Sequence, residues 1–251
     1  MPETIAILFV AHLLGDFVFQ PNWMVRGKKT FYVLLLHAAI PAAIATLFLG
    51  CLHPQIIGLT FVTHAAIDFT KVRLKDRMMW FIIDQMAHAV VLITLAWFNA
   101  NAASVGWWAK HLPNDFIPWY YAGLSLVSGL VLIISVGSII VGKSTAPFTA
   151  EIKEFLATSS EEHHQGLTDG GKFIGWMERA LVLMLLLIGQ PNGIGFLLAA
   201  KSILRFGEIK ERKDRMFAEY VLIGTFLSFG WALLVAVLTQ QAIEYWLSSP
   251  C

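Results

Sequence analysis

The sequence predicts an all-α, polytopic membrane bundle of about eight transmembrane helices. Of its 251 residues, 57% are hydrophobic and only 14% are charged, whereas soluble domains contain about 25% charged residues. The mean hydropathy is +0.66. Apolar runs of about 17 to 24 residues recur along the chain, and a helix needs about 20 such residues to cross the hydrocarbon core. This composition excludes an ordinary soluble globular domain.

Eight apolar runs define the expected helices. They cover residues 4–20, 31–50, 55–72, 79–99, 119–141, 173–189, 193–207 and 218–241. The first run lacks the basic start of a cleavable signal sequence. The net charge of +1 gives no basis for charge-driven nucleic-acid binding. Cys51 and Cys251 are expected to be unpaired thiols, with a bridge between them as the weaker alternative.

Basic residues fix the expected orientation of the helices. Alternate loops hold 14 of the 18 Lys and Arg residues, whereas the opposite loops hold only Lys110. The 14 are Arg26, Lys28, Lys29, Lys71, Arg73, Lys75, Arg77, Lys143, Lys153, Lys172, Lys210, Arg212, Lys213 and Arg215. Because cytoplasmic loops are enriched in Lys and Arg, this pattern predicts four cytoplasmic loops and both termini outside.

A His/Asp pattern occurs three times in the first four expected helices. His12 precedes Asp16 by four residues, His64 precedes Asp68 in the same way, and residues 84 and 88 carry the reversed order, Asp then His. Positions i and i+4 share one helix face. The fourth helix runs opposite to the first and third, so the reversed order places its residues at matching depths. The carboxylates should form one layer nearer the cytoplasm, and the imidazoles a second layer about 6 Å deeper.

His37, in the second expected helix, is placed in the imidazole layer as well. Seven candidate metal ligands result: His12, Asp16, His37, His64, Asp68, Asp84 and His88. Ionisable residues inside membrane helices are costly and functional by default, and a cation would satisfy them together. A proton or ion pathway and a purely structural hydrogen-bond network are the alternatives. Imidazole with carboxylate suits zinc, or manganese or iron where carboxylates dominate. Seven ligands exceed one zinc site, so either two metals or one metal with supporting carboxylates is expected.

The rest of the chain is expected to form a second module. Residues 1–99 would be the four-helix His/Asp site module, and residues 100–251 the C-terminal module of helices five to eight. Residues 100–118 form an outer loop, and its Trp107 and Trp108, together with Trp119 at the start of the next helix, suggest an interfacial aromatic belt. The polar stretch of about residues 143–172 is expected to form an amphipathic segment on the cytoplasmic membrane surface.

A second polar cluster lies in the expected helices six to eight. Arg179, Lys201 and Arg205 are candidates for holding an anionic group, tuned by Glu178 and Glu208. The alternative is that these charges neutralise one another as interhelical pairs. Gln20 and Gln85, near the His/Asp pairs, are further candidates for contacting substrate.

The His/Asp motifs resemble those of a bacterial family of multi-pass membrane proteins known as domain of unknown function 3307. The resemblance covers about residues 5–97, through His12-Leu-Leu-Gly-Asp16 with Gln20, His37, His64-x-x-x-Asp68 and Asp84-Gln85-x-x-His88. Gly175-Trp-Met-Glu178-Arg179, Ala200-Lys201-Ser202 and Phe217-Ala-Glu219-Tyr220 are similar to longer members. The resemblance implies a bacterial inner membrane location and no established activity. A looser similarity, in the His-x-x-x-Asp spacing alone, exists to membrane-bound metal-dependent hydrolases.

These observations favour a metal-dependent hydrolase that acts on a phosphoester or lipid-linked anionic substrate at the inner leaflet. One of Asp16, Asp68 or Asp84 would serve as the general base. The alternative is an ion or proton transporter or channel, or a ligand-gated effector, that uses the same residues. The expected partners are the lipid bilayer, an anionic small molecule or lipid head group, and further copies of the chain in a homo-oligomer.

Overall fold

The computed structural model of the protein describes residues 1–158, 169–206 and 212–248, and these residues contain helices and no β-strand. The chain divides into two compact units. The first comprises residues 1–131 and 241–251, and the second comprises residues 132–240. The expected module of residues 1–99 lies entirely within the first unit. The functional division that the sequence suggested at residue 99 stays a prediction.

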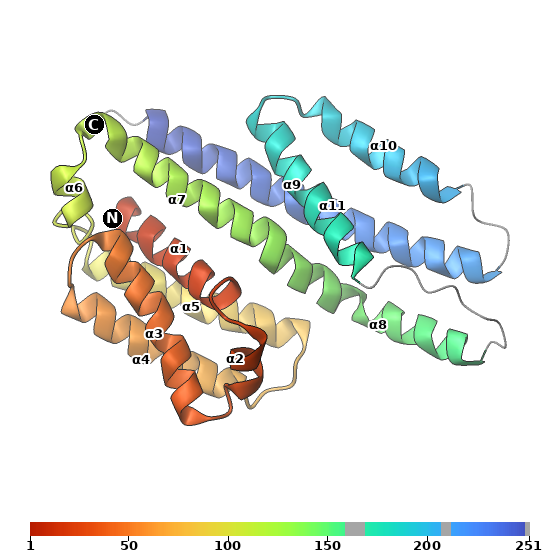
Figure 1. Ribbon diagram of the computed structural model, residues 1–251, viewed down its shortest axis with the longest axis horizontal. Coiled ribbons are helices and arrows are strands. Elements are labelled where there is room, and N and C mark those ends of the chain that lie inside the picture. Colours follow the sequence, from red (N-terminus) through yellow and green to blue (C-terminus); the bar gives the residue numbers. More distant parts are fainter. Residues whose placement is uncertain (159–168, 207–211, 249–251) are drawn as a thin grey trace. The chain divides into compact units, whose positions relative to one another are not determined.

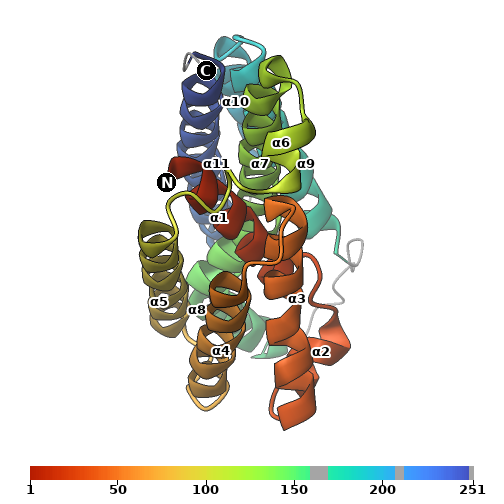
Figure 2. The same ribbon diagram turned by 90° about the vertical axis from the view of Figure 1, so that its left-hand side faces the viewer.

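The first unit is built around α1. Its helices are α1 (Pro2–Phe17), α2 (Asn22–Gly27), α3 (Phe31–Leu49), α4 (Pro54–Lys71), α5 (Met78–Phe98), α6 (Trp107–His111), the 3₁₀ turn η1 (Asn114–Phe116) and α7 (Ile117–Val131). α1 packs against α3, α5 and α7, and α4 packs against both α3 and α5 (Figures 1 and 2). Ile7, Leu8, Val10 and Ala11 of α1 are at most 1% exposed. Because α1 is enclosed on several sides, its Thr4, His12 and Asp16 side chains are buried.

The loop after α5 closes the C-terminal end of α3. Gly50, in a left-handed conformation with φ of 66°, ends α3, as glycine commonly does. Trp107 N donates to Gly50 O at 2.9 Å, and Trp108 Nε1 donates to Leu47 O at 2.8 Å. Tyr120 Oη donates to Phe48 O at 2.7 Å. Residues 100–118 therefore form more than an outer loop, because Trp107 and Trp108, together with Tyr120 of α7, satisfy carbonyls at the end of α3 that have no helical partners.

The second unit contains the π-helical turn η2 (Leu132–Val136), α8 (Gly137–Thr158), α9 (Gly170–Leu187), α10 (Asn192–Phe206) and most of α11 (Arg212–Ser248). A π-turn interrupts the regular i to i−4 bonding, and side chains from α9 and α11 bind its carbonyls. Arg179 Nε donates to Ile133 O at 2.7 Å, and Trp231 Nε1 donates to Leu132 O at 2.8 Å. The two contacts hold η2 to its neighbouring helices.

All eight predicted segments are helical, but only four helices of the described chain are long and apolar enough to cross a membrane. These candidate spans are Phe31–Leu49, Met78–Phe98, Asn114–Ile152 and Ala218–Ser248. The predicted number of eight spans is therefore not supported. At 16 and 15 residues, α1 and α10 reach about 24 and 22 Å, short of a core of about 30 Å. α4 and α9 have 18 residues each but contain several ionisable side chains.

The segment predicted to be amphipathic, at about residues 143–172, begins within α8, and its position on the membrane surface stays a prediction. α8 runs from Gly137 to Thr158 without a break. Thr145 Oγ1 and Thr149 Oγ1 donate to carbonyls one turn back, at 2.9 and 3.1 Å. Pro147 is accommodated inside this helix. Residues 159–168 of the predicted segment lie outside the described residues, as does Cys251.

The close contact between the loop after α5 and the end of α3 should contribute to the stability of the first unit. A Cβ at Gly106 would lie 1.8 Å from Leu49 O, whereas a Cβ at Gly58 meets nothing within 4 Å. Gly106→Ala must displace backbone, so it should lower the free energy of unfolding by about 2 kcal/mol or more. Gly58→Ala, in the interior of α4, should be neutral or raise it by up to about 1 kcal/mol. Thermal unfolding of both variants in detergent measures the difference, and equal melting temperatures would contradict the described loop.

Candidate metal centre

Four buried imidazoles from four helices are in contact with one another. His12 comes from α1, His37 from α3, His64 from α4 and His88 from α5, and each is at most 4% exposed. The ring centroids of His12 and His88 lie 4.6 Å apart, those of His64 and His88 4.5 Å, and those of His37 and His64 5.0 Å. The structure thus brings together the four histidines that the sequence placed at one depth.

The three i, i+4 pairs keep the spacing that a helix gives them. His12 Nε2 lies 4.0 Å from Asp16 Oδ2, His64 Nε2 lies 3.8 Å from Asp68 Oδ2, and His88 Nδ1 lies 3.7 Å from Asp84 Oδ1. The shortest contacts between these groups, however, join different helices. The pairing within each helix therefore serves mainly to aim both side chains at one point.

Asp16, His37 and His64 present three ligand atoms in a nearly equilateral triangle. Asp16 Oδ1 lies 3.1 Å from His37 Nε2 and 3.1 Å from His64 Nε2, and the two nitrogens are 3.0 Å apart. Zinc bonds of about 2.0–2.1 Å place ligand atoms about 3.3 Å apart in a tetrahedral site and about 2.9 Å apart in an octahedral one. The triangle falls between these values, so an ion above its plane can bond to all three atoms.

Hydrogen bonds alone satisfy this arrangement poorly. His37 Nε2 has His64 Nε2 at 3.0 Å and the carboxylates of Asp16 and Asp68 at 3.1 Å each. A ring nitrogen carries either one proton or one lone pair, so it cannot bond well to three such neighbours. A cation shared by His37, His64 and Asp16 would bond to each of them at once.

His88 is held in the tautomer that a metal ligand requires. Its Nδ1 donates to Asp84 O at 2.9 Å, which leaves the lone pair on Nε2. That nitrogen is buried and has no hydrogen-bond partner, and the same is true of His12 Nδ1 and of Asp84 Oδ1. Buried polar atoms are normally bonded, so these vacant acceptors are consistent with a second position for a cation.

Among the described residues, three sets of buried side chains have the mutual spacing of metal ligands. They are His12 with His64 and His88, Asp16 with His37 and His64, and Asp16 with Asp84 and His88. Six of the seven predicted ligands belong to these sets. The seventh, Asp68, touches the site through His37 and is itself completely buried.

Two lysines, which the sequence assigned only to cytoplasmic loops, complete the cluster. Lys28 Nζ lies 2.6 Å from Asp68 Oδ2, and Lys71 Nζ lies 2.5 Å from Asp84 Oδ2. Lys28 is only 7% exposed. With neutral imidazoles, three carboxylates and two ammonium groups leave one buried negative charge. Such a charge is costly in a low-dielectric environment unless a cation or an added proton balances it.

The two glutamines predicted to contact substrate bind residues of the cluster. Gln85 Nε2 donates to Asp84 Oδ2 at 2.8 Å, and its Oε1 lies 3.2 Å from His12 Nε2. In the amide orientation that satisfies both ends, Gln20 donates to Asp16 O at 2.8 Å and accepts from Lys28 Nζ at 2.5 Å. Both glutamines therefore orient ligands and their lysine partners within the first unit.

Two cavities of different size adjoin the cluster. One of about 10 Å³ lies against His12, His64 and His88, which is room for about one water molecule. The other, of about 350 Å³, is a groove between α4 and α5. Its walls are mainly apolar and include Ala66, Ile67, Leu74, Trp80, Ile83 and Ala87, and its charged groups are Lys71 and Asp84. The groove joins the buried cluster to the surface of the first unit.

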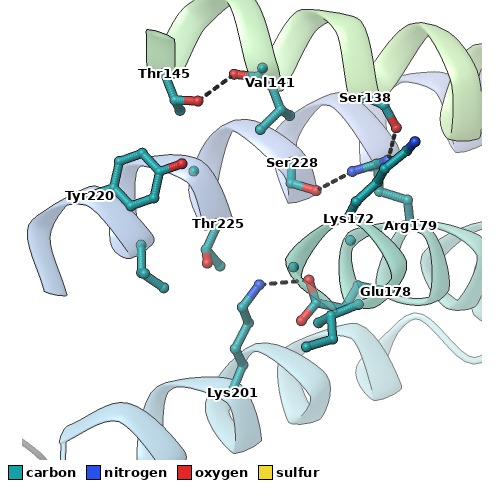
Figure 3. Close-up of a pocket in the computed structure, with 16 residues that line it drawn as sticks. Ser138, Val141, Thr145, Lys172, Glu178, Arg179, Lys201, Tyr220, Thr225 and Ser228 are labelled. Carbon is teal, nitrogen blue, oxygen red and sulfur yellow. Dashed lines mark hydrogen bonds and ion pairs between the residues drawn. The ribbon is translucent and has the colours of Figure 1, made fainter. Parts of the chain in front are cut away.

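Glu178, Arg179 and Lys201, three of the residues predicted to hold an anion, lie in the second unit (Figure 3). Lys201 Nζ lies 2.6 Å from Glu178 Oε2, an interhelical ion pair of the kind expected as the alternative. Arg179 is 3% exposed, and most of its donors bind the η2 carbonyls and nearby serine hydroxyls. The side chain of Arg205 and the whole of Glu208 lie outside the described residues.

Residues 4–112 match the family described as protein of unknown function (DUF3307). This match confirms the resemblance that the His/Asp motifs indicated, over the part of the chain that carries all seven candidate ligands. No curated protein and no solved structure matches the chain.

If the triangle of Asp16, His37 and His64 holds a metal ion, the purified protein should retain that ion only when His64 is present. His64 belongs to two of the three ligand sets, so His64→Ala should reduce the divalent metal in purified protein from about one ion per chain to background. His111→Ala is the matched control, because His111 is exposed and stacks on Trp107 outside the cluster. Elemental analysis of both variants and wild type measures the content. Wild-type protein that retains no metal after equilibration with zinc would contradict the site.

Proposed function

We propose that the protein is an integral membrane, metal-dependent hydrolase that acts on an amphiphilic ester with an anionic head group, a phosphoester in particular. The observation that carries this proposal is the triangle of Asp16, His37 and His64, whose spacing suits a divalent cation and does not suit hydrogen bonding alone. Zinc fits the imidazole-rich set best, and manganese or iron are alternatives. A bound divalent ion supplies a Lewis acid and lowers the pKa of a coordinated water.

Asp84 is the best placed of the three aspartates to act as the general base. It belongs to a ligand set with Asp16 and His88, and it also lines the groove between α4 and α5. Its Oδ1 has no hydrogen-bond partner, while Lys71 and Gln85 hold Oδ2. A carboxylate with one fixed oxygen and one open oxygen can accept a proton without losing its position. Asp68 is fully buried beside Lys28, which suits a supporting role.

The groove supports an amphiphilic substrate. Its apolar walls suit a hydrocarbon chain, and Lys71, whose side chain is 33% exposed, provides a cation where the groove meets Asp84. The outward faces of both helices are apolar, with Phe69, Ile82 and Met86 each about half exposed. A lipid-linked molecule in the bilayer would therefore reach the site sideways, with its anionic group at Lys71.

We further propose that α1, α4, α9 and α10 cross the bilayer together with the four candidate spans, in the inner membrane of a bacterium. Lys28 and Lys71 reach neighbouring aspartates of one cluster, so the two basic loops belong on one side of the membrane. That requires α3 and α4 to cross as a pair. Because α1 and α4 are packed among other helices, they need fewer apolar residues than a helix surrounded by lipid. Both termini would then lie outside.

Proton or ion transfer is the second candidate function. The observation that favours it is the chain of four imidazoles with ring centroids 4.5 to 5.0 Å apart along His12, His88, His64 and His37. Proton relays in membrane proteins use such series of His and carboxylate groups. An added proton would also balance the buried negative charge of the cluster.

The proposed orientation predicts the result of reporter fusions. A reporter joined after Cys251 should be external, and one inserted after Lys75 should be cytoplasmic, because four basic residues surround that position in the loop after α4. Paired alkaline phosphatase and fluorescent protein fusions measure the two locations. A cytoplasmic C-terminus together with a cytoplasmic Lys75 loop would mean an even number of crossings after α4 and would contradict the proposed topology.

The hydrolase proposal predicts different kinetic effects at Asp84 and Lys71. Asp84→Asn removes the proton acceptor and should lower kcat by about 100-fold or more. Lys71→Met should mainly raise KM, because its charge attracts the substrate before and during the reaction. Asp115→Asn, at an exposed position of η1, is the control. A series of nitrophenyl phosphodiesters with alkyl chains of increasing length, assayed with and without a chelator, provides the readout.

Chelator-insensitive proton or ion flux in proteoliposomes, with no hydrolysis of any of these esters, would contradict the hydrolase proposal and support the second candidate. Hydrolysis that responds to the chelator but not to Asp84→Asn would retain the metal site and exclude Asp84 as the base.

A further inference from the structure

The second unit contains a polar pocket that the proposed reaction does not use. Its volume is about 400 Å³, and it is lined by α8, α9, α10 and α11. In Figure 3 the side chains of Thr145, Tyr220, Thr225, Lys201 and Glu178 surround the open space. Several lining residues are glycines, and a Cβ at Gly142 or Gly171 would meet nothing within 4 Å. The space is therefore an open chamber of the size that a small molecule occupies.

The pocket has an excess of positive charge among its described lining residues. Lys172, Arg179 and Lys201 line it together with a single carboxylate, Glu178. Lys201 and Glu178 form a 2.6 Å pair whose side chains are only 24% and 14% exposed. Partial burial strengthens the attraction of such a cluster for an anion relative to the same charges at the surface.

Arg179 presents one open edge to this pocket. Its Nε and Nη2 donate to carbonyls of η2 and to Ser138, and Nη1 donates to Ser228 Oγ at 3.1 Å. Nη1 carries two hydrogens, and its second one has no partner among the described residues. A Cβ at position 175 would lie 3.1 Å from Nη1, so the glycine there keeps this edge accessible. The buried guanidinium is thus held in place by its other N–H groups, and the second N–H of Nη1 is free to bind a ligand.

We infer that this pocket is a binding site for a phosphate group, carried by a small molecule or by a lipid head group. Lys201 and Arg179 supply the charge, and the hydroxyls of Thr225 and Tyr220 line the same space as further donors. Phosphate oxygens accept from both cationic and hydroxyl donors. Glu178 positions Lys201 and also opposes the anion, so it limits the affinity. The inference does not depend on the metal centre in the first unit.

The test uses the full chain in detergent and measures binding of inorganic phosphate by equilibrium dialysis. Lys201→Met should weaken phosphate binding at least tenfold. Gly175→Ala should weaken it several-fold by covering Nη1 of Arg179. Glu178→Gln should strengthen it several-fold, because it removes the opposing charge while keeping a hydrogen-bond acceptor for Lys201. Lys110→Met, at an exposed lysine of the first unit, should bind phosphate as wild type does.

A second arm measures how well the protein is retained in nanodiscs that contain phosphatidic acid, compared with nanodiscs of phosphatidylcholine alone. Lys201-dependent binding of free phosphate identifies a soluble ligand, whereas Lys201-dependent preference for phosphatidic acid alone identifies a lipid head group, and either result supports the site. Absence of both effects overturns it. Equal losses of binding in Lys201→Met and Glu178→Gln would also overturn it, because they indicate that the ion pair is purely structural.

Discussion

The structure of the first unit depends on the need to compensate ionisable groups buried among apolar helices. An isolated charge in such surroundings costs several kcal/mol even after relaxation, and this unit buries three aspartates, four histidines and Lys28 together. They are brought to one place by α1, α3, α4 and α5, so the cost is met by mutual contacts and, in our account, by a cation. The same requirement explains why α1, which carries His12 and Asp16, lies among other helices.

Much of this centre can be predicted from the sequence. Helical periodicity and the alternation of basic loops place His12, His37, His64 and His88 at one depth, and the structure shows their rings in contact. The reversed order of Asp84 and His88 is informative because it compensates for the reversed direction of its helix. Metal binding itself stays a prediction, because the same side chains would also support a proton relay.

Other features could not be predicted, for identifiable physical reasons. Lys28 and Lys71 have long, flexible side chains, and their sequence positions fit exposed loops as well as pairing with Asp68 and Asp84. The groove between α4 and α5 depends on packing that hydropathy does not report. The role of Arg179 in binding the carbonyls of η2 depends on a π-turn for which residues 132–136 give no evident signal. The number of membrane spans could not be predicted from the apolar runs alone, because α1 and α10 are shorter than those runs suggested.

X-ray absorption at the metal edge of the purified, zinc-equilibrated protein tests the central claim most directly. Our account predicts a shell of nitrogen and oxygen ligands at about 2.0–2.1 Å, with the outer-shell scattering of two or more imidazoles. That scattering should diminish when His37, which the triangle requires, is replaced by alanine. A spectrum of hydrated zinc without imidazole scattering, or of sulfur ligands at about 2.3 Å, would contradict the assignment of Asp16, His37 and His64 as a metal site.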